Sequence, residues 1–425
     1  MIKNISQKFR NNFSWILIAT AYAIAFMHRL SPQAITADLA HDFSTDFAGI
    51  GVIASAYFYG YMLIQIPAGM LVDIFGVRKV VLASLLTSTI GTLLFAGSGN
   101  LAMVFLARVI IACGDGLIFT ALLKHVALQF SDRRFGLMSG LSQVSGYLGG
   151  VMATTPLTAA VSSYGWRACF SLIALISLVN LASCYLILPN SEAIKKNDIG
   201  KRIKHLLRAV ADLLSYRAAW GCALTFTSHF VAVTTLAGVW GLPMVMYTFG
   251  IARNKASICI LVFMVANAIG SIWGGYISDR VKDLINTLLV NCVLRITLLL
   301  ALTPLIAKNF GFTYGVLCFF FLGLVAGGTV PLILKSLKHI YSARFIGAGA
   351  SINTTLAGII GALIQPLLGL ILLGFSDENA RVSEHAIGGY DIFVLILVLI
   401  SCGGFIGPLM MRGKSTLEMK GQPST

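Results

Sequence analysis

The chain alternates long apolar runs with short polar segments over almost its whole length. Each run is about 20 residues long, the length at which an α-helix crosses the hydrocarbon core of a bilayer. The runs lack the period-2 alternation of a membrane β-barrel. They predict an all-α polytopic membrane protein with twelve transmembrane helices at about 14–36, 47–70, 80–97, 101–123, 136–160, 166–188, 219–244, 256–277, 286–307, 312–335, 346–374 and 389–411.

Only one polar segment between the predicted spans is long, and it follows the sixth span, at 189–218. Leucine, isoleucine and valine recur there at helical spacing, with basic residues on the other face, which predicts an amphipathic helix lying on the inner leaflet. We therefore expect three parts: an N-terminal six-helix bundle at 1–188, a cytoplasmic linker at 189–218, and a C-terminal six-helix bundle at 219–425.

Composition agrees with a membrane protein, because 57% of the residues are hydrophobic and only 11% are charged. Soluble domains carry roughly 25% charged residues. The net charge of +15 reflects topology: 23 Lys and Arg residues fall on one side of the predicted spans and five on the other. The positive-inside rule then places both termini in the cytoplasm. We expect a lipid bilayer as partner and no nucleic acid.

The eight cysteines all lie in apolar segments, with no spacing typical of a metal site. We therefore expect no metal, no other cofactor and no disulfide. Nucleotide-binding and hydrolytic motifs are missing too, so an ATP-driven pump, an enzyme or a receptor is disfavoured.

A short polar loop, Gly69–Lys79, joins the second and third spans. Its spacing Gly69-x-x-x-Asp73 recurs in the equivalent loop of the second half as Gly275-x-x-x-Asp279, followed by Arg280. Internal duplication of this kind is typical of secondary transporters.

With these features assembled, the chain resembles the major facilitator superfamily. The loop is similar to that family's signature G-x-L-x-D-x-x-G with basic residues after it, and the fourth span has an Arg followed by small residues, as a second family motif does. Strings at 28–32, 57–67, 135–140 and 240–243 resemble bacterial organic anion:cation symporters and phagosomal amino-acid and nucleoside transporters. The resemblance implies two six-helix bundles that rock about a central site, usually coupled to protons, and a cytoplasmic gate formed by Gly69, Asp73, Gly76, Arg78, Lys79, Asp279 and Arg280.

Ionisable groups inside spans cost about 2.5–3.5 kcal/mol each by insertion scales, so they normally face a cavity or a partner. Arg29 in the first span and Arg108 in the fourth fall at nearly the same predicted depth. Two guanidiniums facing one cavity would bind a carboxylate or phosphate through their forked donors. We predict Arg29 as the main ligand of a substrate anion and Arg108 as its helper. The alternative for Arg108 is a structural contact with Asp115 or with carbonyls at the end of a span.

Asp115 is the only carboxylate deep within a predicted span. It is our candidate for the coupling proton site, and His28 is the alternative, because imidazole titrates near neutral pH unaided. A static Arg108–Asp115 ion pair is a third interpretation. Symporters of the resembling group often have a carboxylate just before the Arg of span one, where this chain has His28.

Further polar and aromatic residues fall on spans that line the cavity in the resembling family. For each of them packing or an interhelical hydrogen bond is the competing role. The candidates for substrate contact are Tyr57, Tyr61, Gln143, Tyr147, His229, Trp240, Asn267, Asn353 and Gln365. Arg295, by contrast, is expected to lie toward the end of a span and reach the headgroups.

These observations predict a proton-coupled symporter that takes up a small polar organic solute, an organic anion or an amino acid. The alternative is a proton-coupled exporter of a siderophore, drug or metabolite. We expect a monomer with many spans in a bacterial inner membrane, with a small-molecule substrate and protons as the coupling ion.

Overall fold

The protein is described by a computed structural model that covers residues 2–189, 200, 214–340, 346–375 and 387–412. These residues form helices joined by short turns, and none of them lies in a strand. The helices of the first half are α1 (Ile2–Leu30), α2 (Pro32–Asp42), α3 (Phe47–Phe75), α4 (Val77–Ala96), α5 (Leu101–Gln129), α6 (Asp132–Met152), α7 (Thr155–Tyr164) and α8 (Trp166–Ile187). Those of the second half are α10 (Arg217–Thr235), the π-helix η2 (Leu236–Trp240), α11 (Gly241–Phe249), α12 (Arg253–Arg280), α13 (Leu284–Ala301), α14 (Pro304–Ala307), α15 (Phe312–Ile340), α16 (Ile346–Gly374) and α17 (Ile387–Met411).

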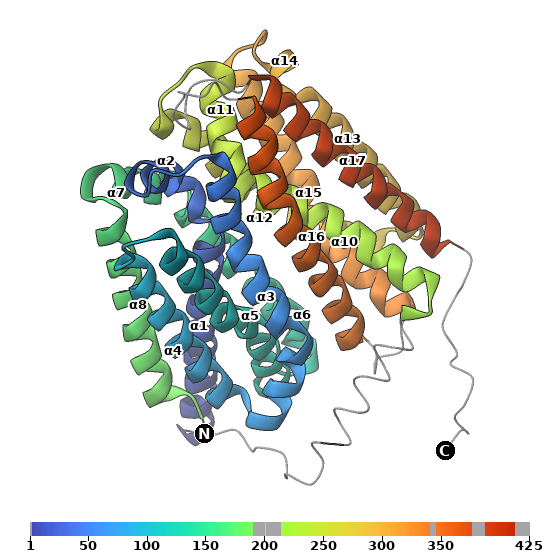
Figure 1. The fold of residues 1–425 in the computed structure, drawn as a ribbon. Coiled ribbons are helices and arrows are strands. Elements are labelled where there is room, and N and C mark those ends of the chain that lie inside the picture. The colour runs from blue at the N-terminus through green and yellow to red at the C-terminus, as the bar shows by residue number, and fades with distance from the viewer. Residues whose placement is uncertain (1, 190–199, 201–213, 341–345, 376–386, 413–425) are drawn as a thin grey trace.

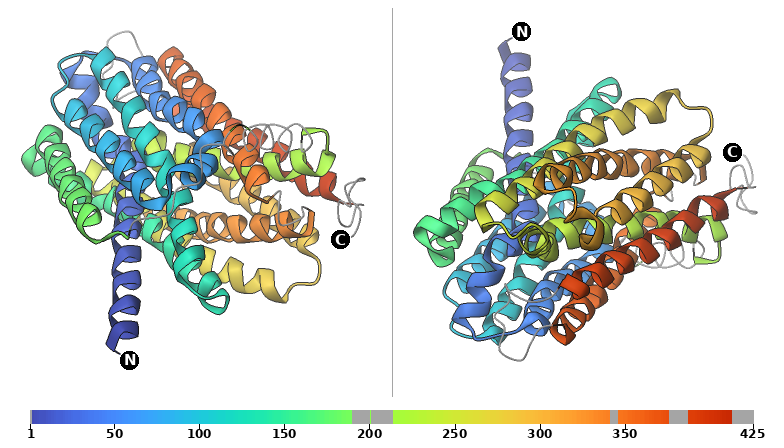
Figure 2. Two further views of the ribbon diagram at one scale, coloured as in Figure 1. Left: turned by 90° about the horizontal axis from the view of Figure 1, so that it is seen from below. Right: turned by 90° about the horizontal axis from the view of Figure 1, so that it is seen from above.

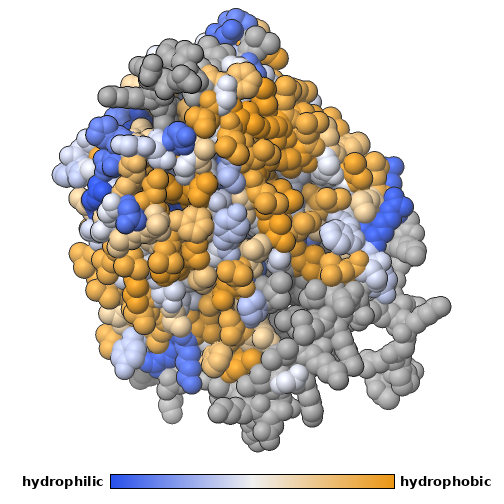
Figure 3. All heavy atoms as spheres, in the orientation of Figure 1, coloured by the Kyte–Doolittle hydropathy of each residue, from blue (hydrophilic) through white to orange (hydrophobic). Residues whose placement is uncertain are grey.

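The helices form a membrane-spanning bundle, as the apolar runs predict. Within the described residues, eleven helical segments are long and apolar enough to cross a bilayer. Hydrophobic side chains cover the middle of the surface as a broad band, with hydrophilic residues gathered toward its edges (Figure 3). The all-α polytopic fold is therefore confirmed.

Four predicted spans are interrupted where the sequence suggested continuous helices. The first ends at Leu30 and restarts at Pro32, and the fifth divides into α6 and α7. The ninth stops at Ala301 before the short α14, and the seventh contains η2. Prolines stand in the first turn of α2, α7 and α14, where their missing N–H costs nothing. Hydropathy does not register such breaks, because the residues around them remain apolar.

Helices of the two halves occupy separate sides of the molecule (Figure 1). Figure 2 shows the same arrangement along the perpendicular direction, and α3 packs against α16 and α6 against α12 where the halves meet. The α3–α16 contact is close: a Cβ on Gly51 would lie 2.6 Å from the carbonyl oxygen of Gln365. The division into two domains with a linker remains a prediction, and the amphipathic helix lies outside the described residues.

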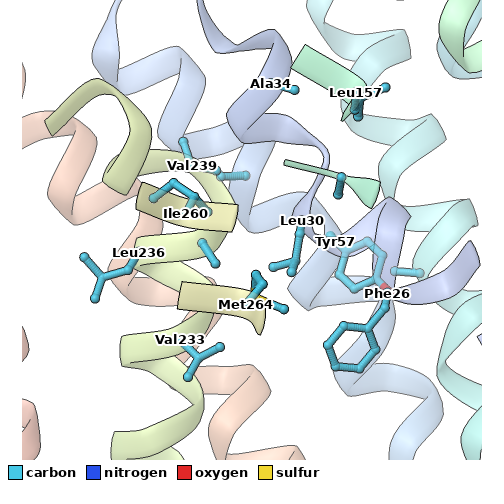
Figure 4. Packing of buried hydrophobic residues seen from close by; sticks show 14 of the residues in the cluster. Phe26, Leu30, Ala34, Tyr57, Leu157, Val233, Leu236, Val239, Ile260 and Met264 are labelled. Carbon is cyan, nitrogen blue, oxygen red and sulfur yellow. The ribbon is translucent and has the colours of Figure 1, made fainter. Parts of the chain in front are cut away.

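Apolar side chains of both halves meet near the middle of the bundle. Figure 4 shows Phe26, Leu30 and Tyr57 of the first half facing Met264 and Val239 of the second. These residues belong to one buried cluster that runs through both halves. The two halves therefore share a core in this conformation.

Polar contacts join the halves at the end of the molecule that carries α2, α7 and α11, which we call the α2 end. Arg253 Nη1 donates to Asp38 Oδ2 at 2.5 Å, and Ser162 Oγ lies 3.4 Å from Asn254 Oδ1. Farther from this end, Thr354 Oγ1 of α16 donates to Gln65 Oε1 of α3 at 3.3 Å. Among the described residues, the ion pair that joins the halves, Arg253–Asp38, lies at the α2 end, which we therefore call the bridged end.

Candidate functional site

Arg29 lies at the centre of a group of aromatic rings that come from both halves of the chain. Its guanidinium carbon is 5.0 Å from the ring centre of Phe26, 5.6 Å from Tyr57, 4.5 Å from Tyr61 and 5.6 Å from Phe230. Its Nε has no hydrogen-bond partner, and no carboxylate pairs with it, among the described residues. The side chain is only half-buried. A cation held by ring faces keeps its N–H donors for another ligand.

The position of Arg29 follows from the break after α1. Arg29 stands in the last turn of that helix, two residues before Ser31, whose N–H closes the helix on the Met27 carbonyl. The sequence therefore places the cation at a helix end inside the bundle. Phe230 reaches it from α10, and its ring lies nearly parallel to that of Tyr61, with ring centres 6.3 Å apart.

Asp115 pairs with His28, the residue next to Arg29. His28 Nδ1 lies 3.1 Å from Asp115 Oδ2, and both side chains are buried. The Tyr57 hydroxyl donates to the same oxygen at 3.3 Å. The structure therefore brings together the two candidate proton sites and links them to the ring beneath Arg29. The third interpretation requires a static Arg108–Asp115 ion pair, and no such pair forms among the described residues.

His28 contacts a hydroxyl on one side of its ring and a carboxylate on the other. The Thr92 hydroxyl oxygen lies 2.7 Å from the Ser88 carbonyl and 3.1 Å from His28 Nε2. It either donates to the carbonyl and accepts from the ring, or donates to the ring itself. In the second arrangement a neutral imidazole donates from Nδ1 to Asp115, and in the first a proton on Nδ1 or on the carboxyl completes that contact.

Arg108 is buried beside the same ring. Its guanidinium carbon lies 5.0 Å from the ring centre of Tyr57, so both predicted arginines contact one tyrosine. Arg108 Nη1 donates to the carbonyl of His28 at 2.6 Å. That carbonyl is in the last turn of α1, where acceptors lack a partner within the helix and a cation is favoured. The contact is of the kind expected in the structural alternative, and the role of Arg108 as substrate helper remains a prediction.

The fold and this site agree with the comparison of the chain with known families. The model of the Major Facilitator Superfamily matches residues 14–366. The chain belongs to the major facilitator superfamily. This family match confirms the resemblance that the sequence motifs indicated.

Relatives of the superfamily that match the chain include transporters of organic anions. A gentisate transporter of Corynebacterium glutamicum is 28% identical over 353 residues, covering 80% of this chain and 76% of the relative. A probable sulfoacetate transporter of Cupriavidus necator is 22% identical over 414 residues, covering 92% of each chain.

Solved superfamily structures share the fold. A bacterial homologue of the human lysosomal transporter Spinster, in an inward-facing and unoccupied conformation, matches with a TM-score of 0.74 and 15% identity, covering 95% of this chain and 98% of that one. A D-xylose-proton symporter matches with a TM-score of 0.72 and 16% identity, covering 96% and 99%.

The other predicted substrate contacts of this superfamily member differ in whether their polar atoms have partners. Trp240 and Gln365 are buried and bonded to each other, with Nε1 of the indole 2.8 Å from Oε1 of the amide. Gln143 accepts a weak hydrogen bond from Tyr22 at 3.5 Å, and Tyr147 packs edge-on against Phe26. His229 and Asn267 each have a buried side-chain atom without a partner among the described residues, and Asn353 is buried.

The residues predicted to form the cytoplasmic gate lie at the end opposite to α2. Gly76 has a φ of +79°, a conformation that favours glycine, and it forms the turn between α3 and α4. Arg78 donates to the carbonyl of Tyr185 at 2.6 Å, within its own half. Arg280 stacks on Tyr276 at 3.8 Å. Gly69 has no neighbour within 4 Å of its Cβ position, and Lys79 is exposed. The side chains of Asp73 and Asp279 lie outside the described residues.

A second charged cluster at the α2 end was not expected from the sequence. Trp166 Nε1 donates to Asp42 at 3.0 Å, and Arg167 forms an ion pair with the same carboxylate. These bonds, led by that of the indole, hold the pKa of Asp42 below its ordinary value. The cluster ties α2 to α8 within the first half.

Several residues of the site carried no signal in the sequence. Phe26 and Phe230 are ordinary apolar residues of their spans, and Thr92 is one of many hydroxyl residues. These residues contact the site only because of how the helices pack against one another. The expectation that Arg295 reaches the headgroups is wrong, because its side chain is fully buried.

Proposed function

We propose that this protein is a proton-coupled importer of a small organic anion, working by alternating access between two six-helix bundles. The observation that carries the proposal is Arg29: a half-buried guanidinium, free of any carboxylate partner in the described residues, held by rings from both halves. A cation placed between the bundles attracts an anion, and its contacts change when the bundles move relative to each other.

The chemistry of Arg29 supports a carboxylate or a similar anion as substrate. A planar guanidinium presents parallel N–H donors that match two oxygens at once. Tyr61 and Phe230 supply apolar and π surfaces beside it. The relatives that are named as transporters of gentisate and sulfoacetate, both organic anions, support the same class.

The His28–Asp115 pair is proposed as the proton site. His28 Nδ1 and Asp115 Oδ2 lie 3.1 Å apart and are buried from solvent in this conformation, so a proton can be held between them. Tyr57 links this proton to the substrate site, because its hydroxyl bonds Asp115 while its ring lies under Arg29. Removing the proton leaves a carboxylate whose charge competes with substrate for the same arginines. Substrate and proton are therefore expected to bind together.

The bridged α2 end is proposed as the closed periplasmic side of a bacterial inner-membrane protein, with both termini in the cytoplasm. The Arg253–Asp38 ion pair would then be an outer gate. The signature loop at Gly69–Lys79 would form the inner gate when the site faces outward. The abundance of Lys and Arg on the side of the termini supports this orientation.

Transport by the purified protein in liposomes tests the proposal. We expect uptake of labelled gentisate or sulfoacetate when the side facing the substrate is acidic, and collapse of accumulation with a protonophore. Asp115→Asn is expected to keep substrate exchange but lose accumulation driven by a pH gradient. Accumulation by Asp115→Asn equal to wild type would refute the proton site, and movement of substrate only against the proton flux would identify an exporter.

A further inference from the structure

Another arginine lies buried in the second half, and no carboxylate of the described residues pairs with it. Arg295 stands in the middle of α13 and is 0% exposed. Its Nη2 donates to the hydroxyl of Ser228 on α10 at 2.7 Å and lies 3.8 Å from Cys292 Sγ. Its Nε and Nη1 have no partner among the described residues.

The acids nearest along the neighbouring helices cannot reach Arg295. Asp283 precedes α13 and is twelve residues away, roughly 18 Å along the helix. Gly404 of α17 lies against Arg295, and a Cβ built on it would be 3.1 Å from Nη2. Asp391 on the same helix is thirteen residues earlier than Gly404, roughly 20 Å along the axis. Among the described residues, therefore, no carboxylate forms an ion pair with this cation.

A second unpartnered donor lies beside it. His229 is 5% exposed, and its Nδ1 has no hydrogen-bond partner among the described residues. It follows Ser228 on α10, and the charge of Arg295 acts on its imidazole. Among the described residues, Arg295 on α13 and His229 on α10 thus have three buried nitrogens without a hydrogen-bond partner.

Burying a guanidinium without a counter-charge carries a large desolvation penalty, and unmade hydrogen bonds add to it. Neutralising the side chain by losing a proton is not available to Arg. An anion from solution supplies both the charge and the acceptors. The site is enclosed by α10, α13 and α17, and Gly404 brings α17 within contact of Ser228, so the anion must be small.

We propose that Arg295 and His229 bind one small inorganic monoanion, of the size of chloride, inside the second half of the protein. This site is separate from Arg29, which lies among the rings of Phe26, Tyr57, Tyr61 and Phe230. The bound anion neutralises the charge of Arg295 and so stabilises the packing of the helices around it. The proposal concerns binding and stability, so it does not depend on the transport function proposed above.

Thermal unfolding of the purified full-length protein in detergent tests the site. Sodium chloride is titrated against sodium sulfate at matched ionic strength, since sulfate is too large and too strongly hydrated for an enclosed site. We expect chloride to raise the unfolding midpoint by a few degrees in a saturable manner, and bromide to replace it. A midpoint that rises with chloride without saturating, as sulfate raises it by general exclusion from the protein surface, would overturn the proposal and indicate that buried water satisfies the arginine.

Two variants show which arginine is responsible for the stabilisation by chloride. Arg295→Met keeps the volume of the side chain without its charge, and we expect it to fold and to lose the chloride response. Arg29→Met is the matched control and is expected to keep the response in full; a response lost there instead would assign the anion to the central site. If Arg295→Met does not yield folded protein, crystals of the wild type are soaked in bromide and its anomalous scattering is measured. We expect an anomalous peak beside Arg295, and its absence would refute the site.

Discussion

Replacing Arg29 by Lys keeps the charge and removes the fork, so it tests how the substrate is held. In the wild type we expect two parallel N–H···O bonds from the guanidinium to the substrate carboxylate. A hydrogen bond to a charged group is worth about 1.5–3 kcal/mol. Losing one such bond predicts an affinity about 10- to 150-fold weaker, at about 1.4 kcal/mol per factor of ten.

The structure also predicts what the substitution leaves unchanged. Arg29 is held mainly by ring faces, which the ammonium of Lys can also contact, and its Nε makes no hydrogen bond among the described residues. The unfolding midpoint should therefore stay close to that of the wild type. A loss of affinity with preserved stability separates a ligand-binding role from a structural one.

The assay is equilibrium binding of a labelled organic acid to the purified protein, together with the concentration dependence of uptake in liposomes. Arg167→Lys is the matched control, because Arg167 also stacks on a ring, that of Trp166, but lies at the start of α8. It should bind like the wild type. Near wild-type affinity in Arg29→Lys would refute bidentate binding, and an equal loss in Arg167→Lys would refute the assignment of the site.

Three further predictions address the gate, the packing and the charge cluster at the α2 end. Arg253→Ala removes the ion pair between the halves and should shift the population toward the outward-open state about 3- to 5-fold, at roughly 1 kcal/mol, measured by distances between spin labels; Arg167→Ala, whose ion pair stays within one half, should not. Gly149→Val should lower the unfolding midpoint by several degrees, because a Cβ there would lie 1.9 Å from a backbone carbonyl oxygen of α1, whereas Gly140→Val meets open space and serves as control. The lowered pKa of Asp42 stabilises the folded state above the ordinary carboxylate pKa, so the stability lost in Asp42→Asn at pH 7 should diminish as the pH falls through the folded pKa; a loss that stays constant down to pH 3 would contradict this.

The sequence by itself determined the fold class and the residues from which the site is built. Apolar runs of about 20 residues require helices in a bilayer, because the backbone has no other way to satisfy its hydrogen bonds there. Arg29 and Asp115 stood out for a related reason, since a charge within a span needs a partner or a cavity. Both inferences depend on local composition, which a single sequence contains in full.

The tertiary structure decided which groups are partners. Asp115 meets His28 and not Arg108, although Arg108 lies on its own helix, because the rotation of α1 against α5 sets which side chains face each other. Phe230 reaches Arg29 from the other half, 201 positions along the chain, and nothing in its neighbourhood in the sequence distinguishes it. Arg295 was misplaced for the same reason, because depth and exposure depend on the helices packed around a residue and not on its distance from the end of its own span.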